Sequence, residues 1–238
     1  MIQRMSRGIR SINVTNGVQN TLKSTLGLTN YFCSMFFLQT TASWFSHIAP
    51  LDRKVFYAIN VSGSNRFFDT LMPFVREANL WVPLYLFLLV FALLNFGKRG
   101  SLWFIFFACT AGVCDIIASH LIKESIFRLR PCQDPDLADT MNSLAHYCPS
   151  SSSFVSAHAT THFGLAFFVV LTLKPYTTPW IRLFFVWAAL ISYAQVYVGV
   201  HYPFDVLCGA VIGSVLGYLM ARIFNNYVGL ISLQHKLT

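Results

Sequence analysis

Five long apolar runs constrain the fold of this chain more than any other feature of its sequence. They cover residues 78–97, 102–122, 156–173, 183–200 and 206–221, and the first contains no charged residue. A helix needs about 20 apolar residues to cross a bilayer. With 55% hydrophobic and 11% charged residues, the chain is also too apolar for a soluble domain of its length. The sequence therefore predicts an all-α bundle that is embedded in a membrane.

Two further segments precede these runs. Residues 31–50 are uncharged, but polar side chains dilute their apolar character. This segment is either a first transmembrane helix or an interfacial leader, so we expect six transmembrane helices, or five with an interfacial helix. Residues 51–76 mix large apolar and charged side chains, a pattern typical of a helix lying along the membrane surface.

The charged residues divide by sign between the two predicted sides of the membrane. The net charge is +8, but the basic residues lie at the ends of the apolar runs and form no nucleic-acid patch. In a six-helix arrangement, one side holds Lys and Arg without any Asp or Glu, and the other holds every acidic residue except Asp115. The positive-inside rule makes the basic side cytoplasmic. The loops at 123–155 and 199–205 then face outward, and no nucleic-acid partner is expected.

A first polar cluster lies on this outward side, where residues 123–131 read KESIFRLRP. Lys123 and Arg130 are seven residues apart, so a helix would place both cations on one face, and Pro131 would then end it. Two fixed cations suit a group with several anionic oxygens. The alternative is that both side chains simply extend from the membrane boundary toward water.

Two more clusters follow on the same side. Ser156 and His158 open an apolar helix, whose N-terminal N–H groups favour anions, although Ser156 alone would also serve as an N-cap. His162, one turn further on, is interpreted as a polar residue of the bundle interior. His201 and Asp205 are four residues apart, and a carboxylate on one ring nitrogen leaves the other free to attack. A purely structural His–Asp hydrogen bond is the alternative.

Together the clusters resemble the three signature motifs of the type 2 phosphatidic acid phosphatase superfamily. This family contains membrane lipid phosphatases and is related to vanadium haloperoxidases. Its first motif, K-x-x-x-x-x-x-R-P, matches residues 123–131 in full. Its second, P-S-G-H, reads VSAH here and keeps Ser156 and His158. The resemblance extends over residues 52–222 and implies the all-α core that the family shares with the haloperoxidases.

The third motif contains the main departure. The family pattern is S-R, five residues, His, three residues, Asp; His201 and Asp205 match, but Ala194 and Gln195 replace the S-R pair. Gln195 thus occupies the place of a third phosphate-binding arginine. A slower enzyme, a substitute cation or an inactive lipid-binding relative would each account for this. Arg128 is the candidate substitute, although a two-residue offset on a helix would point it away from Arg130.

The resemblance implies a role for each matched residue. His201 would form a phosphohistidine, Asp205 would orient it, and His158 would protonate the leaving oxygen. The groups that would hold the phosphate are Lys123, Arg130, Ser156, the backbone N–H near Ala157, and Gln195 as a neutral donor. The family requires no metal and no cofactor, so neither is expected here.

The resemblance also implies an organisation and a substrate class. Residues 51–225 would form the phosphatase domain, 1–50 an N-terminal extension with the first helix, and 226–238 a tail. The substrate would be a lipid phosphate or diphosphate at the outer face of a bacterial inner membrane. Undecaprenyl diphosphate is the first candidate; lipid A, phosphatidylglycerophosphate and phosphatidic acid are the alternatives. Transfer of the phosphate to another lipid remains open, and no obligate protein partner is expected.

Three other residues carry separate predictions. Cys132 and Cys148 lie in the long outward loop, where a disulfide would persist and would tie Arg130 to the segment before Ser156. Two free thiols are the alternative. Asp115 is a carboxylate within a membrane span and is therefore a functional candidate. We interpret it as a structural acid that bonds to a neighbouring helix.

Overall fold

The computed structural model describes residues 46–137, 139–145 and 147–231. The chain divides into two compact units, Met1–His47 and Ile48–Thr238. Of the first unit, only Ser46 and His47 are described, and both are helical. The candidate segment at 31–50 therefore lies mostly outside the described residues.

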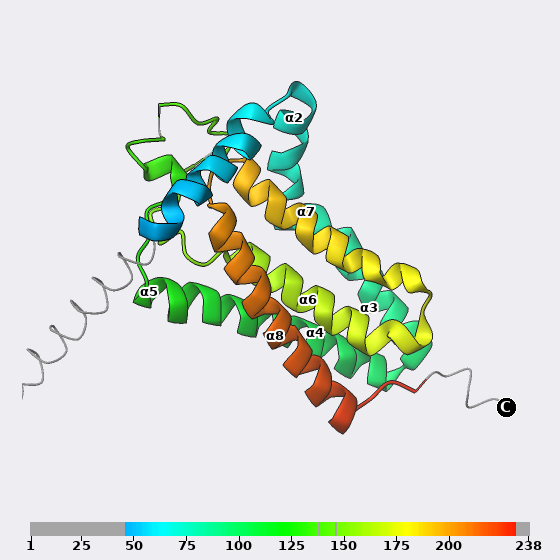
Figure 1. Ribbon diagram of the computed structural model, residues 1–238. Coiled ribbons are helices and arrows are strands. Elements are labelled where there is room, and N and C mark those ends of the chain that lie inside the picture. The colour runs from blue at the N-terminus through cyan, green and yellow to red at the C-terminus, as the bar shows by residue number, and fades with distance from the viewer. Residues whose placement is uncertain (1–45, 138, 146, 232–238) are drawn as a thin grey trace, which may run out of the picture. The chain divides into compact units, whose positions relative to one another are not determined.

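Every regular element in the described part of the second unit is helical (Figure 1). Residues 48–57 are helical and continue into the π-helical η1, Ala58–Ser62. The remaining elements are α2 (Arg66–Val75), η2 (Ala78–Trp81), α3 (Val82–Phe96), α4 (Lys98–Ile116), η3 (Ile117–Ile122), α5 (Lys123–Ser125), η4 (Pro131–Gln133), α6 (Ala157–Leu173), η5 (Lys174–Tyr176), η6 (Pro179–Arg182), α7 (Leu183–Tyr197) and α8 (Pro203–Tyr227).

Four continuous helices are long and apolar enough to cross a membrane. They are Ala78–Phe96, Lys98–Ser125, Pro179–Tyr197 and Pro203–Tyr227, close to four of the apolar runs in the sequence. The fifth run forms α6, which has 17 residues and packs among α4, α7 and α8. Its side chains are mostly buried, so α6 is the central helix of the bundle (Figure 1).

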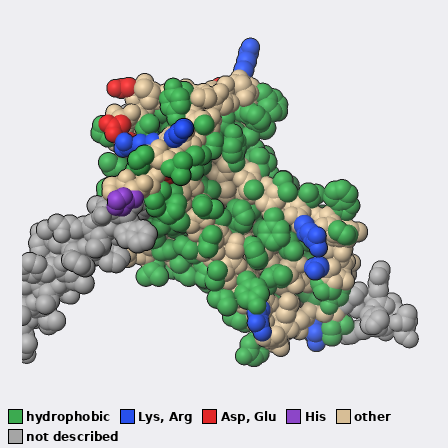
Figure 2. Space-filling model, viewed as in Figure 1, with side chains coloured by type: hydrophobic (Ala, Val, Ile, Leu, Met, Phe, Trp, Pro, Cys, Tyr) green, Lys and Arg blue, Asp and Glu red, His purple; other side chains and the backbone are tan. Residues whose placement is uncertain are grey.

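The outer faces of the bundle are apolar, as a bilayer requires. Large side chains such as Phe87 and Leu94 on α3, and Leu207 and Val211 on α8, are exposed. Figure 2 shows hydrophobic side chains over the sides of the helices, whereas acidic side chains appear at one end only. The chain is therefore an integral membrane protein.

Glycines allow α6 and α8 to lie in close contact. A Cβ atom at Gly213 would stand 2.0 Å from the carbonyl oxygen of Thr160, and one at Gly217 would stand 2.1 Å from that of Gly164. Small residues permit such close approach of membrane helices. The two helices start at the same end of the bundle, where the backbone N–H of Ser156 donates to the carbonyl of Asp205 at 3.1 Å. The packing thus fixes the second motif against the third.

The helix predicted to extend from Lys123 to Arg130 is wrong. It ends at Ser125; Ile126 and Arg130 have extended backbone angles, and residues 126–130 are not helical. Pro131 disfavours helical geometry in the residue before it. The extended chain is then held by the loop at 151–153: Ser152 Oγ accepts from Arg128 N and donates to Ile126 O, and Ser153 N donates to Arg128 O.

Candidate active site

The extended segment directs two arginines into the protein. Alternate residues of an extended chain point to opposite sides. Arg128 and Arg130 are buried, whereas Phe127 and Leu129 are 57% and 45% exposed. The helical offset that separated Arg128 from Arg130 in the sequence prediction therefore does not apply.

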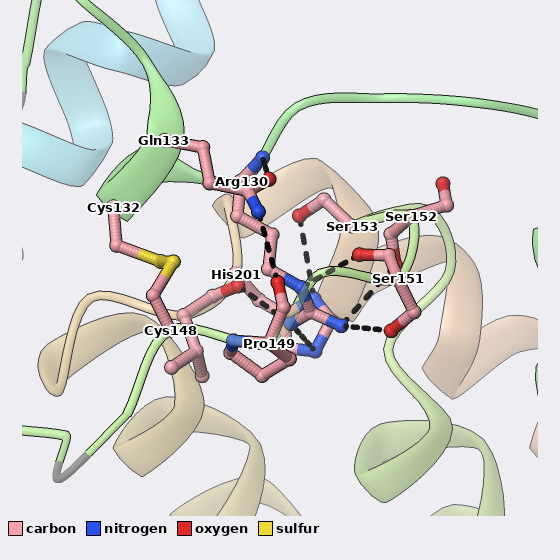
Figure 3. Close-up of a disulfide and its surroundings, with 10 residues drawn as sticks. Arg130, Cys132, Gln133, Cys148, Pro149, Ser151, Ser152, Ser153 and His201 are labelled. Atoms are coloured by element: carbon pink, nitrogen blue, oxygen red, sulfur yellow. Dashed lines mark hydrogen bonds between the residues drawn. A yellow bond between two sulfur atoms is a disulfide. The ribbon is translucent and has the colours of Figure 1, made fainter.

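Arg130 is held in place by neutral oxygens (Figure 3). Its guanidinium donates to the backbone carbonyls of Ser151, Ser152 and Val200 at 2.9–3.2 Å, and to Ser151 Oγ at 3.1 Å. Its Nη1 also lies 3.2 Å from His201 Nε2. Burial is the main reason that the pKa of Arg130 falls to about 10, so it is still charged at neutral pH. A rigid cation therefore adjoins one ring nitrogen of His201.

The other ring nitrogen of His201 faces acceptors. Nδ1 is 3.8 Å from Asp205 Oδ2 and 3.5 Å from Ser153 Oγ, and that hydroxyl donates to Asp205 Oδ2 at 2.5 Å. Burial, with the charges of Arg130 and Lys123, lowers the pKa of His201 to about 4 against the opposing effect of Asp205. The imidazole is therefore neutral at neutral pH. A proton on Nδ1 satisfies the acceptors and leaves the Nε2 lone pair toward Arg130.

Arg128 closes a buried ion-pair network behind this pair. Its guanidinium contacts Asp205 Oδ1 at 2.5 Å and Asp52 Oδ2 at 2.6 Å, and its Cζ lies 4.2 Å from the centre of the Tyr202 ring. Burial alone would lower the pKa of Arg128, but the two carboxylates outweigh it and raise the pKa. Asp52 also accepts from the backbone N–H of Phe204 at 2.8 Å. Arg128 is thus committed to two carboxylates and is not the substitute cation considered above.

The second motif forms the start of α6. Ser156 is its N-cap, with its hydroxyl accepting from Ala159 N at 3.4 Å, and it is fully buried. His158 lines a cavity of about 380 Å³ that also contacts Ala78 and Asp115. His162 lies in the bundle interior as expected, with its ring packed edge-on against Trp187 at 4.9 Å. The cavity lies between α4 and the start of α6.

Two other predicted residues have clear positions. Asp115 accepts a hydrogen bond at 3.0 Å from Ser119 of its own helix. The predicted bond to a neighbouring helix is not found among the described residues. Gln195 is 1% exposed, and its backbone carbonyl accepts a hydrogen bond from the backbone N–H of His201 at 3.3 Å. Its side-chain Nε2 has no hydrogen-bond partner in the described structure. Gln195 therefore lies inside the bundle next to His201, not toward lipid.

A disulfide joins Cys132 to Cys148 near Arg130 (Figure 3). Gln133, beside Cys132, donates through Nε2 to the carbonyl of Pro149 at 3.1 Å. The bridge and this hydrogen bond connect the chain after Arg130 to the chain before Ser151. The first and second motifs are therefore linked covalently as well as by packing.

Sequence reasoning missed two participants, Ser153 and Asp52, and misjudged Arg128. The only signal for Ser153 was its place in a run of serines just before the second motif. Asp52 lies far from the motifs in sequence, and no pattern connects it to Asp205. The sequence signal against a helix at residues 126–130 is Pro131, which by itself indicates only that a helix ends before it.

Comparison with known proteins identifies the family of this chain. The family model of the PAP2 superfamily matches residues 100–228. This chain belongs to the PAP2 superfamily. The match covers all three clusters and confirms the family that they resemble.

Several relatives are phosphatases by name. The chain is 31% identical to a "Lipid A 4'-phosphatase" of Bacteroides thetaiotaomicron over 64% of its own length and 68% of the relative. It is 27% identical to "Undecaprenyl-diphosphatase BcrC" of Bacillus subtilis, over 72% and 83% of the two chains. A "Lipid A 4'-phosphatase" of Porphyromonas gingivalis is 27% identical over 47% of each chain.

Two crystal structures have a similar fold. One is Aquifex aeolicus LpxE, with a TM-score of 0.52, 24% identity, and coverage of 72% of this chain and 95% of that one. The other is the transmembrane PAP2-type phosphatidylglycerolphosphate phosphatase of Bacillus subtilis, with a TM-score of 0.56, 21% identity, and coverage of 82% and 96%. The helical bundle is therefore the fold of transmembrane PAP2 proteins.

Proposed function

We propose that this chain is a membrane lipid phosphatase that uses His201 as its nucleophile. The observation that carries the proposal is the arrangement around His201: a neutral imidazole, with Asp205 and Ser153 on Nδ1 and the Arg130 guanidinium on Nε2. A phosphate oxygen bound by Arg130 would bring the phosphorus atom toward the Nε2 lone pair. Membership of the PAP2 superfamily and the phosphatase relatives support the same class.

The reaction would proceed in two displacements. His201 Nε2 attacks phosphorus, the bond from phosphorus to the lipid oxygen breaks, and His158 gives its proton to that oxygen. The Asp205 carboxylate stabilises the positive charge that develops on the imidazole. His158 then accepts a proton from water as the water oxygen attacks the phosphohistidine, which releases inorganic phosphate and restores His201.

The transferring phosphoryl group would be held by preorganised donors. Lys123 and Arg130 supply positive charge, Ser156 and the N–H of Ala157 supply donors at the start of α6, and Gln195 supplies a neutral amide. In phosphoryl transfer, the protein contributes chiefly position and charge stabilisation.

We further propose six transmembrane helices, with the site at the outer face of a bacterial inner membrane. The support is the sign of the charges. The described ends opposite the site carry basic residues such as Lys98, Arg99, Lys174 and Arg182, whereas Asp52, Asp134 and Asp136 lie near the site. The positive-inside rule would place the basic end in the cytoplasm.

Undecaprenyl diphosphate and lipid A are the two candidate substrates, because named relatives act on each. A panel assay of the purified protein distinguishes them: free phosphate is measured with undecaprenyl diphosphate, lipid A, phosphatidylglycerophosphate and phosphatidic acid. Phosphate that appears on an acceptor lipid instead of in solution would indicate a phosphotransferase. No turnover of any lipid by the folded protein would indicate a ligand-binding relative.

His201→Ala tests the mechanism directly. We expect a loss on the order of 10⁴-fold or more in kcat with the substrate found by the panel, because removing a nucleophile removes the pathway. Acid-labile phosphate should be trapped on the wild-type protein but not on the variant. EDTA should leave activity unchanged, and vanadate should inhibit as a mimic of the transfer geometry. Near-normal turnover by folded His201→Ala would refute the proposal.

A further inference from the structure

The site lacks a cation at one position of the third motif. Gln195 fills that position, is buried beside His201, and has no hydrogen-bond partner for its side-chain Nε2. An uncharged amide does not replace the electrostatic stabilisation that a third cation gives to a phosphoryl group. Arg128 cannot take over this task, because Asp52 and Asp205 already bind its guanidinium.

A second buried arginine lies on a different helix. Arg76 directly follows α2, and its side chain is 10% exposed. α2 packs against α7, the helix that carries Gln195. Ala78, two residues beyond Arg76, lines the cavity next to His158. Arg76 therefore lies at the end of a helix that packs on the helix of the third motif, two residues from the cavity of the second.

The charge of Arg76 has little compensation within the described structure. Its Nε is buried without a hydrogen-bond partner, and its ion contact is with Glu77 at 3.9 Å. Glu77 is a largely exposed neighbour in sequence, at a distance too long for a hydrogen bond. A buried cation without a close partner costs free energy. Such a cation is accounted for if an anion binds next to it.

The charge also acts on one residue of the site. Burial is the main cause of the lowered pKa of Arg130, and Asp205 opposes it. The positive charge of Arg76 lowers this pKa further. Arg76 is thus close enough to influence Arg130.

We propose that Arg76 supplies, from the end of α2, the third cation that the third motif lacks at Gln195. The inference rests on the proposed function and adds a phosphate-binding residue outside the three motifs. The backbone holds this arginine in place: Arg76 N donates to Met72 O at 3.2 Å, and Trp81 Nε1 donates to Val75 O at 2.9 Å. The turn after α2 is therefore fixed before substrate arrives.

Moving the charge tests this inference. Arg76→Gln should lower kcat/KM by about 100-fold, the scale of losing one preorganised donor to a transition state. Adding Gln195→Arg to that variant should restore at least about tenfold, because the charge returns from α7. Arg66→Gln, at an exposed position on the same helix, is the matched control and should remain within about twofold. Vanadate should bind Arg76→Gln about tenfold more weakly than wild type.

Arg76→Lys is the second variant, in case Arg76→Gln does not fold. It keeps the charge but loses the planar donors, so we expect an intermediate loss of about tenfold in kcat/KM and weaker vanadate binding. The inference is overturned if either folded variant binds vanadate as tightly as wild type, or if Gln195→Arg gives Arg76→Gln no recovery. These outcomes with an inactive His201→Ala would reject only the role of Arg76, whereas an active His201→Ala would reject the proposed function itself.

Discussion

Two groups of charges meet at His201 and differ in how they are neutralised. On the Nδ1 side, Asp205, Arg128 and Asp52 form a buried chain of ion pairs. On the Nε2 side, Arg130 is held by carbonyl and hydroxyl oxygens, and the described residues provide no ion pair for it. Lys123, whose charge adds to the lowered pKa of His201, likewise has no ion pair among the described residues. The paired residues Asp205, Arg128 and Asp52 neutralise one another and hold His201 in place; we call them the support. The unpaired cations are suited to bind an anion. Substitutions on the two sides should therefore have opposite balances between activity and stability.

Asp205→Asn should have the largest effect, because Asp205 both contacts the nucleophile His201 and pairs with Arg128. It would lose the charge that stabilises the His201 imidazolium and would leave Arg128 with a single carboxylate. We expect a loss of about 10³–10⁴-fold in kcat, as for the orienting acid of a hydrolase triad. Removing one partner of a buried pair should also cost about 3–5 kcal/mol of stability. Kinetics and a detergent-based thermal melt measure the two effects. An active variant as stable as wild type would contradict the role of Asp205 in both activity and stability.

Lys123→Met should affect activity alone. No described residue forms an ion pair with this cation, so we expect a fall of about 100-fold in kcat/KM while the melting temperature is unchanged or rises. Lys98→Met, at the first residue of α4 and so at the opposite end of that helix, is the control for removal of a lysine charge. A drop in stability for Lys123→Met similar to that of Asp205→Asn would show that Lys123 belongs to the support.

Mild acid should not inactivate the enzyme through protonation of His201. Since burial lowers the pKa of His201 to about 4, the imidazole is neutral and able to attack above that pH, and protonation removes it below. We expect the acid limb of the kcat/KM profile that depends on His201 to fall about tenfold per pH unit below pH 4. The profile is measured with a soluble short-chain substrate in detergent. An acid limb near pH 6.5 that shifts in Asp205→Asn would contradict the lowered pKa of His201.

Asp52→Asn should affect stability more than chemistry. Asp52 contacts Arg128 but not His201, so we expect a stability loss of about 3 kcal/mol and a fall in kcat of only about tenfold. Asp136→Asn is the control, because that carboxylate is exposed in its pair with Arg53. If Asp52→Asn lowers kcat as much as Asp205→Asn does, the two carboxylates act as one unit in the reaction.

Loss of the disulfide should have the smallest effect on chemistry. The double variant Cys132→Ser/Cys148→Ser opens a bridge across a separation of 16 residues, which the chain-entropy model values at about 3 kcal/mol. Most contacts of Arg130 come from residues 151–152 and 200, so kcat should fall only a few-fold. Wild type melted with reductant should match the variant, whereas wild type without reductant should melt at a higher temperature. A loss of activity comparable to Lys123→Met would show that the bridge positions Arg130.

The sequence alone determined the class of fold and the chemical groups of the site. Apolar runs must avoid water, so their length and position fix helices in a membrane, and the observed helices begin and end within a few residues of them. The spacing of the three motifs identified the family that the comparison confirmed. Tertiary structure decided how the charges are used. Residues 126–130 lie outside a helix because the loop at 151–153 bonds to them, and this geometry, with Asp52 from a distant helix, assigns Arg128 to the support. Likewise, no sequence pattern links Arg76 to the three motifs, and only the packing of α2 on α7 suggests that it serves the site. Electrostatic interactions depend on distance in space and on burial, and neither is encoded by the separation of residues along the chain.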